Sequence, residues 1–407
     1  DIKPGGLAEY GIYPDKHRLK AGLRKKYFTI LENPKIHYFG NLNVGCHRDL
    51  TIPQIKQLEF DAILVTAGAQ QVRRLGLEGE NLKGVYYAWE VVSNYNSMPP
   101  YSQRSYPIGK KVAAIGIGNV MADVSRFLID KLRVDEVTAI ARRGPAEIKI
   151  HQTELSKIAA NLDMQDFDRE LDRVSPLMYS LGQDPEQVRA FIEKACEYCE
   201  EADSDTRLRL RFLKTPLRFL GNKDKHVSRL EMIENTMVFE NGKTKSVPLS
   251  MKDYLEIDTV ILAVGSSVDT QLGLPVKGNK FNVSPVPTYP VDNRSHELLD
   301  QAKGENIEGI FVAGWSRVAS YGLVGISARD GVSGARAALQ YINECKKTHS
   351  INIEQYRERI LMLKNTIVEL PQVFKLMKVE KERARELGLD EYKFSTNREM
   401  LIAMGLI

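Results

Sequence analysis

The sequence predicts an α/β protein with doubly wound parallel sheets, because strand-like and helix-like segments alternate along most of its 407 residues. Two short apolar runs read as buried strands: Ala62–Val65, which leads through Thr66 and Ala67 to Gly68, and Val112–Ile115, which Gly116 follows directly. A strand that ends at glycine lets the backbone approach a ligand closely, since no side chain intervenes. The composition agrees with an ordinary globular protein, at 43% hydrophobic and 27% charged residues.

The same numbers exclude several classes of protein. A length of 407 residues predicts two to three domains at about 150 residues each. The longest apolar runs fall well short of the roughly 18 residues that a membrane span needs. A net charge of +4 gives no general case for nucleic-acid binding. Four cysteines make no disulfide framework, so we expect a reducing, cytoplasmic compartment.

One strand template occurs three times along the chain. Phe60–Ala69 and Ile257–Ser266 both place Asp before a short buried strand that ends at glycine after small residues. Gly309–Trp315 is similar and precedes a glycine-rich segment. Coincidence among buried strands is the alternative, but three such strands favour two nucleotide-binding halves.

The segment that begins at Gly116 has the order strand, glycines, helix. Gly116 and Gly118 follow the strand Val112–Ile115 and open the helical pattern Val120–Leu132. Glycines in this place let a pyrophosphate meet a helix N-terminus. Met121 stands where a third small residue is usual. A tight strand-to-helix turn without a ligand is the structural alternative.

The end of the next strand, Val137–Ile140, indicates which nucleotide is bound. An NAD site needs an acid there for the ribose 2′-hydroxyl, but the segment carries Arg142 and Arg143. Two guanidinium groups suit a 2′-phosphate, whose oxygens they can pair with bidentately. The sequence therefore predicts NADP rather than NAD, against the alternative of a solvated arginine pair that opens a loop.

The remaining segments carry less chemistry. Residues from about 151 to 205 are expected to be helical without a strand, and the tail beyond about Lys346 is expected to be helical and peripheral. Cys196 and Cys199 have dithiol spacing, but the carboxylates around them would raise the thiol pKa, so a structural role is favoured over a redox one. The seven histidines show no metal-ligand spacing, and we expect no metal.

Six motifs in order connect the chain with a known family: Pro4–Asp15, Gly116–Asp123, Ala141–Pro145, Gly314–Trp315, Gly322–Val324 and Arg398–Leu401. Together they resemble adrenodoxin-reductase-type ferredoxin–NADP reductases, flavoproteins related to the small subunit of glutamate synthase. The resemblance covers nearly the whole chain and is weakest at about 160 to 205. It implies two Rossmann-like domains. The FAD-binding domain is discontinuous, at 1–104 and 286–407, and the NADP-binding domain is 105–285. The family's glycine-rich FAD motif is not found. We expect that it precedes Asp1 and was lost or left out, and an incomplete FAD site is the alternative.

The resemblance also implies site residues. The expected contacts to FAD are Leu7 and Val44 near the adenosine, and Trp315, Gly322, Leu323 and Val324 at the flavin, with Trp315 and Gly322 as the catalytic positions. The expected contacts to NADP are Gly116, Gly118, Asn119 and Val120 at the pyrophosphate, and Arg142, Arg143 and Glu154 at the adenosine phosphate and ribose.

The implied function is transfer of a hydride from NADPH to FAD, followed by single electrons to a ferredoxin or other small iron–sulfur carrier. Two alternatives stay open. They are a glutamate-synthase-like subunit that feeds a larger redox partner, and a non-catalytic NADP-binding relative. Two departures from the family bear on the choice. His17 is displaced by one position behind Lys16, and the helix near Glu193 and Glu197 carries an acidic run that would repel an acidic carrier.

Overall fold

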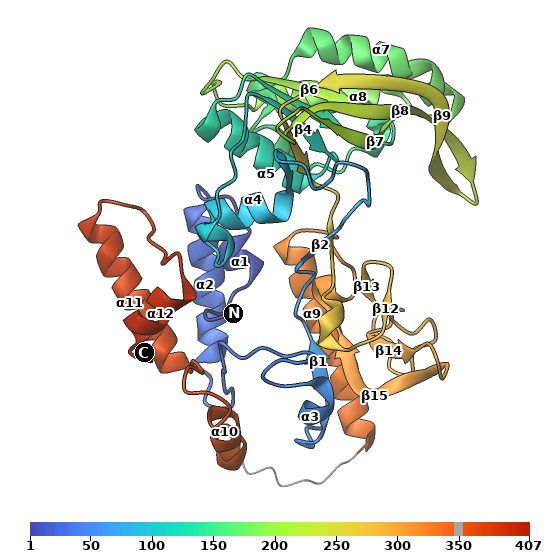
Figure 1. Ribbon diagram of the computed structural model, residues 1–407. Coiled ribbons are helices and arrows are strands. Elements are labelled where there is room, and N and C mark those ends of the chain that lie inside the picture. The colour runs from blue at the N-terminus through green and yellow to red at the C-terminus, as the bar shows by residue number, and fades with distance from the viewer. Residues whose placement is uncertain (346–352) are drawn as a thin grey trace. The chain divides into compact units, whose positions relative to one another are not determined.

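The computed structural model describes residues 1–345 and 353–407 and divides into two compact units (Figure 1). Unit 1 comprises Asp1–Arg73, Tyr95–Gln103 and Gly265–Ile407, and unit 2 comprises Arg74–Asn94 and Arg104–Val264. Both units are discontinuous in sequence. The predicted domains, 1–104 with 286–407 and 105–285, assign two segments to the other side. Residues 74–94 belong to unit 2, where they supply a strand, and residues 265–285 pair within unit 1.

Unit 2 is built on a five-stranded parallel sheet, which confirms the predicted α/β class. Its order is β3 (Val85–Tyr87), β10 (Thr259–Leu262), β4 (Lys111–Ile115), β5 (Glu136–Ile140) and β6 (Arg207–Arg211), and every neighbouring pair is parallel. All four residues of β10 are buried, as the continuous apolar run predicts for a central parallel strand. The carboxyl ends of β4, β5 and β10 therefore meet at one edge.

The helices of unit 2 come mainly from the chain between its strands. α4 (Ala88–Tyr95) follows β3, and α5 (Asn119–Phe127) follows β4 and continues into a π-helical turn, Leu128–Leu132. Residues 151–205 form α6 (Gln152–Leu155), α7 (Met164–Ser180) and α8 (Pro185–Glu197), and no strand is assigned among them, as predicted. Asp163 and Asp184 cap α7 and α8 through their carboxylates.

An antiparallel sheet follows β6, and the sequence analysis did not anticipate it. It consists of β7 (Lys214–Gly221), β8 (Val227–Glu240) and β9 (Lys243–Glu256), in that order. The turn at Asn241–Gly242 has positive φ at both residues, which suits a tight hairpin. The signal was weak because most residues of β9 are exposed or half-buried, so the strand lacks a buried apolar run.

Unit 1 contains a three-stranded sheet of β1 (Ile63–Val65), β15 (Glu305–Val312) and β14 (Glu297–Asp300). β1 and β15 are parallel with Val65 opposite Val312, so the glycines that follow them, Gly68 and Gly314, lie at the same sheet edge. The long helix α9 (Val324–Cys345) packs on β15 and β1. Smaller pairs complete the unit, namely β2 (Gln71–Val72) with β11 (Ser266–Ser267) and β12 (Val276–Lys277) with β13 (Lys280–Phe281).

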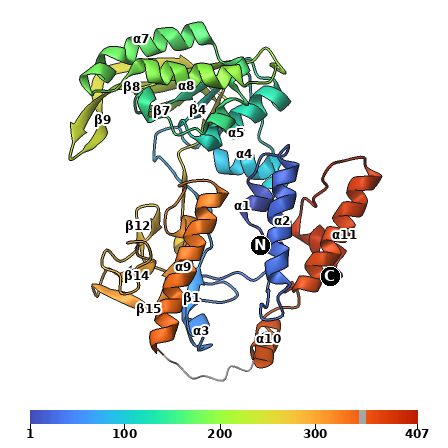
Figure 2. The same cartoon turned by 180° about the vertical axis from the view of Figure 1, so that it is seen from behind.

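The two ends of the chain share one core within unit 1. Buried Ile2 packs with Val368, Val373 and Leu376 from the C-terminal part. The helices that contribute are α2 (His17–Leu31), α11 (Leu370–Glu386) and α12 (Asn397–Met404). α1 (Leu7–Tyr10) packs against α2, while α3 (Ile52–Lys56) and α10 (Ile353–Leu361) lie elsewhere in unit 1. Figures 1 and 2 show α11 beside α2, where the rings of Phe28 and Phe374 lie 5.5 Å apart. The predicted tail is helical in its described part, residues 346–352 lying outside it, and it is integral to this core.

Across the described ranges, the helices lack the length and apolar character that a membrane crossing requires.

Candidate nucleotide-binding sites

The turn after β4 places two glycines at the carboxyl edge of the unit 2 sheet. Gly116 has φ +111°, and a Cβ there would lie 2.6 Å from the carbonyl oxygen of Ala263, so packing against the end of β10 requires glycine. Gly118 differs, because its backbone is extended and no atom lies within 4 Å of the place a Cβ would take. Gly118 is the N-cap of α5 and gives it no side-chain cap. The first N–H groups of α5 therefore border open space that suits a phosphate.

A loop that follows β5 passes the start of α5. Gly118 forms a parallel bridge with Lys149, and Oδ1 of Asn119 accepts the backbone N–H of His151 at 2.8 Å. Val120, the next residue of α5, is 42% exposed. Glu154 lies on α6, which packs against α5. The structure thus brings together the predicted residues from the two separate sequence motifs.

The two arginines after β5 are not equivalent. The Arg142 side chain is exposed, and its backbone carbonyl accepts from Nδ2 of Asn235 at 2.9 Å and from Oγ of Ser246 at 2.7 Å. Nη1 of Arg143 donates to Oε2 of Glu147 at 2.6 Å. Because a carboxylate already engages Arg143, Arg142 is the more available cation for a 2′-phosphate. The sequence analysis gave Arg142 and Arg143 the same role at the 2′-phosphate.

In unit 1, the predicted flavin-end residues gather around the start of α9. Trp315 is half-buried against the apolar cluster of β1 and β15, and its Nε1–H donates to the carbonyl of Tyr321 at 3.2 Å. Gly322 has φ +76°, and a Cβ there would lie 2.6 Å from Cδ1 of Ile326, so glycine is required for this turn. Leu323 is 43% exposed, and Val324 begins α9. The result is a partly exposed apolar surface beside a helix N-terminus, which suits a flat ring system.

Three side chains that the sequence analysis missed hold this turn in place. The Asp330 carboxylate accepts the N–H of Gly314 at 2.7 Å and pairs with the guanidinium of Arg317. Burial alone would raise the pKa of Asp330, but its bonds from Arg317 and Gly314 hold that pKa below its usual value. Oγ of Ser316 accepts the N–H of Gly68 at 3.0 Å, which joins the ends of β1 and β15. Nothing in the sequence signals these partners beyond their place after a glycine-ended strand.

The other two predicted FAD contacts lie apart from each other. Val44 packs against the same apolar cluster as Trp315. Leu7 begins α1 and lies beside Gly11, where a Cβ would be 2.7 Å from Cδ2 of Leu7, and it is not among the residues of that cluster. The structure thus associates Val44, but not Leu7, with the Trp315 region.

The remaining sequence candidates have ordinary surroundings. The ring of His17 lies 3.7 Å from the carboxylate of Asp390, with both side chains exposed. Burial, together with Cys199 and Glu193, raises the pKa of the Cys196 thiol, as expected for a structural cysteine. Within the described ranges, no three histidine, cysteine or acidic side chains lie together in a group that could hold a metal ion.

Known proteins are similar in sequence to most of this chain. No protein-family model matches the chain. It is 27% identical over 352 residues to NADPH-ferredoxin reductase FprA of Mycobacterium leprae, covering 80% of this chain and 72% of that protein. It is 25% identical over 346 residues to the mitochondrial NADPH:adrenodoxin oxidoreductase of Drosophila melanogaster, covering 79% and 69%. The chain is a homologue of the ferredoxin and adrenodoxin reductases. This confirms the resemblance inferred from the ordered motifs.

Solved structures of these reductases share the fold. A variant of Mycobacterium tuberculosis FprA superposes with a TM-score of 0.82 at 21% identity, covering 99% of this chain and 90% of that one. FprA of M. tuberculosis in complex with NADPH gives 0.80 at 20% identity, with the same coverage. The shared fold therefore includes residues 160–205, where the motif resemblance is weakest.

Proposed function

We propose that the chain is an FAD-dependent ferredoxin–NADP(+) oxidoreductase, which takes a hydride from NADPH and delivers single electrons to a ferredoxin-type iron–sulfur carrier. The observation that carries the proposal is the open, uncapped start of α5 at Gly118, with the exposed Arg142 at the end of the neighbouring strand. The names of its relatives state NADPH as the donor and ferredoxin or adrenodoxin as the partner.

The unit 2 residues fit NADPH. The backbone N–H groups of Asn119 and Val120 would bind the pyrophosphate, because Gly118 leaves the space in front of them open. Arg142 would bind the 2′-phosphate. Arg143 would add a second contact through the guanidinium N–H groups that its bond to Glu147 leaves available. Glu154 would meet the ribose. We propose the loop of residues 144–151 as the element that holds these groups in register, through the bond from His151 to Asn119.

The unit 1 residues fit a flavin. Trp315 and Leu323 offer partly exposed apolar surface, and Gly325 leaves open space where a Cβ would stand near the start of α9. Bound FAD would supply the conversion of a two-electron hydride into single electrons. Trp315 and Gly322 would orient the ring and exclude water, and we propose no side-chain nucleophile. Val44, which packs against the same apolar cluster as Trp315, remains a candidate FAD contact, and Leu7 is a weaker one.

The cellular setting is part of the same proposal. All four cysteines are free, which suits a reducing compartment such as the cytoplasm. A ferredoxin-type carrier is the proposed acceptor. Because Glu193 and Glu197 lie on α8, an acidic carrier would bind away from that helix.

Electron transfer to a carrier tests the proposal. The purified holoprotein, supplied with NADPH, is expected to reduce a small ferredoxin and also a one-electron dye. Oxidation of NADPH that requires a co-purifying large chain would support the glutamate-synthase-like alternative instead. No dye reduction by a protein that binds NADPH would support the non-catalytic alternative.

A further inference from the structure

Three sulfur-bearing side chains meet at the carboxyl end of α8. Sγ of Cys196, in the last turn of that helix, lies 3.9 Å from Sδ of Met164, the first residue of α7. Cys199 follows three positions later, and its thiol donates to the carbonyl oxygen of Cys196 at 2.9 Å. All three residues are half-buried, so solvent reaches this three-sulfur group.

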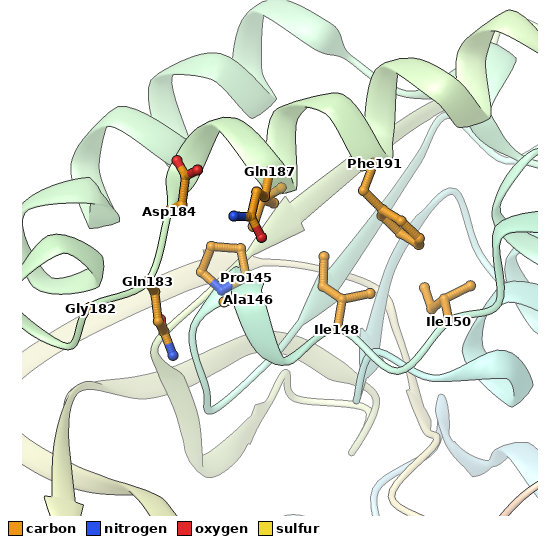
Figure 3. Close-up of a pocket in the computed structure, with 10 residues that line it drawn as sticks. Pro145, Ala146, Ile148, Ile150, Gly182, Gln183, Asp184, Gln187 and Phe191 are labelled. Atoms are coloured by element: carbon orange, nitrogen blue, oxygen red, sulfur yellow. The ribbon is translucent and has the colours of Figure 1, made fainter.

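The three-sulfur group is separate from the nucleotide-binding side of unit 2. The start of α8 and the loop after β5 line a pocket of about 400 Å³, to which α8 and its N-cap contribute Asp184, Gln187 and Phe191 among others (Figure 3). The two cysteines come after Phe191, at the other end of the helix, and neither they nor Met164 line that pocket. The proposed reductase chemistry therefore leaves these sulfurs unused.

The electrostatic surroundings of the three-sulfur group favour a cation. Burial raises the pKa of the Cys196 thiol, and the nearby Cys199 and Glu193 raise it further because their negative charges oppose a thiolate. The carboxyl end of α8 also carries the negative end of the helix dipole. A positive ion between the thiolates would offset these repulsions, and it would displace the protons that the free thiols hold.

The sulfur ligands indicate which metal fits. Metal–thiolate bonds are about 2.3 Å long, so three sulfurs at the corners of a triangle around one ion would lie about 4.0 Å apart. The 3.9 Å between Cys196 and Met164 matches this spacing. A structural zinc site needs four ligands, and among the described residues no third histidine, cysteine or acidic side chain completes a metal-binding group with the two cysteines. Thiolate and thioether sulfurs instead select a soft ion such as Cu(I).

We propose that Cys196, Cys199 and Met164 bind one Cu(I) ion. Binding forms two copper–thiolate bonds and one copper–thioether bond, and it releases the two thiol protons to solvent. No electron is transferred in this step, because copper enters as Cu(I). The inference does not depend on the proposed reductase function, and it gives the C-x-x-C motif the role of a metal ligand.

Competition with a coloured Cu(I) chelator tests the proposal. The full-length holoprotein, reduced and free of oxygen, is titrated against the bicinchoninate complex of Cu(I), whose absorbance falls as copper leaves it. The unsubstituted protein should take up one equivalent. Cys196→Ser and Cys199→Ser should each weaken Cu(I) binding by more than about 100-fold, because changes in the shell around a metal's ligands already cost roughly 10- to 100-fold. Met164→Leu removes only the thioether and should weaken it about tenfold.

Two matched controls and a second measurement accompany the titration. Cys46→Ser and Cys345→Ser remove the other two free cysteines and should bind copper normally. X-ray absorption at the copper edge does not require the cysteine variants to fold. It should show three sulfurs at about 2.3 Å in the unsubstituted protein and two in Met164→Leu.

The opposite results would overturn the proposal. Copper that stays with the chelator in the presence of the unsubstituted protein would reject the site. Normal binding by Cys196→Ser, with loss in Cys46→Ser or Cys345→Ser, would place the copper elsewhere and reject it too. Two sulfurs in both the unsubstituted protein and Met164→Leu would contradict the three-sulfur group. NADPH-dependent dye reduction, measured in parallel and expected to be unchanged in Met164→Leu, shows whether the proposed function stands when the copper site fails.

Discussion

The side chain of Asn119 accepts the backbone N–H of His151 at 2.8 Å, which ties the first residue of α5 to the loop after β5. The carboxamide oxygen of Asn119 is therefore engaged in a hydrogen bond within the protein. Contact with a pyrophosphate then falls to the backbone N–H groups at the start of α5. Asn119 is therefore a positioning residue, which keeps the loop of residues 144–151 beside the proposed pyrophosphate site at the start of α5.

Replacing Asn119 tests this role. In Asn119→Ala the loss of one hydrogen bond, about 1 kcal/mol, should weaken NADPH about fivefold and speed amide exchange at His151. Asn119→Asp keeps the acceptor and should preserve slow exchange, although its charge would repel a pyrophosphate. Hydrogen exchange of residues 148–155 together with NADPH titration measures both. An alanine variant that loses affinity with unchanged exchange would refute the positioning role.

Gly118 and Gly116 should respond differently to the same substitution. Gly118→Ala places a methyl group in the open space before the first N–H groups of α5, so NADPH affinity should fall about tenfold. The melting temperature should change little, because the backbone at Gly118 is extended and suits alanine. Gly116→Ala should destabilise the fold by about 1–3 kcal/mol, because φ is +111° and the Ala263 carbonyl is in the way. Thermal unfolding and NADPH titration of both variants separate the two effects. Normal NADPH binding by Gly118→Ala would argue against a pyrophosphate site at the start of α5.

Arg142 should govern the choice between the two nicotinamide cofactors. Arg142→Ala removes charged hydrogen bonds of about 1.5–3 kcal/mol, so the KM for NADPH should rise about 10- to 100-fold while that for NADH changes little. Arg143→Ala should have the smaller effect, since Glu147 already holds that guanidinium. Arg229→Ala, at an exposed position of β8, serves as the control. Equal losses for both cofactors would remove the argument for a 2′-phosphate site.

A buried ion cluster in unit 1 should dominate the stability of the joined chain ends. The Glu9 carboxylate is 3% exposed and lies 3.0 Å from Nζ of Lys3 and 2.6 Å from Nε of Arg24. Glu9→Gln leaves these cations without their charge partner and should lower the free energy of unfolding by about 3–5 kcal/mol. Urea unfolding at neutral pH measures this loss. The exposed Glu32→Gln should show almost none.

The free energy of unfolding should depend on pH differently in the unsubstituted protein and in Glu9→Gln. Burial would raise the pKa of Glu9, but the charges of Lys3 and Lys393 and the bond from Arg24 outweigh it and hold that pKa well below 4.5. A depressed folded-state pKa contributes stability that is full above the unfolded pKa and is lost as pH falls towards the folded value. The stability gap to Glu9→Gln should therefore be constant above about pH 4.5 and shrink below it. A gap that stays constant in acid would contradict the assigned charge.

The sequence predicted what short-range patterns encode. Gly116 and Gly118 could be found because they lie between a strand and a helix whose periods are visible in the chain, whereas Gly322 was named only through the family resemblance. The partners that hold these turns could not, because they depend on long-range packing. Lys3 pairs with Glu380, 377 positions away, and no local pattern records that contact.

Two further features escaped prediction for related reasons. The bond from Arg143 to Glu147 joins residues only four positions apart. Even so, the sequence does not show whether Arg143 is bound to Glu147 or is as exposed as Arg142, because that depends on the backbone path after β5. The sequence analysis predicted a boundary at 285, and the compact unit ends at Val264. Residues 266–281 form very short strands, whose pairing with β2 and with each other has almost no sequence signal.

Anaerobic titration with NADPH tests the central claim most directly. The purified holoprotein should be yellow, with flavin absorbance in the near-ultraviolet and blue, and one equivalent of NADPH should bleach it while NADH acts far more weakly. A colourless protein, or a flavin spectrum that NADPH leaves unchanged, would contradict the proposal that this chain passes electrons from NADPH through FAD.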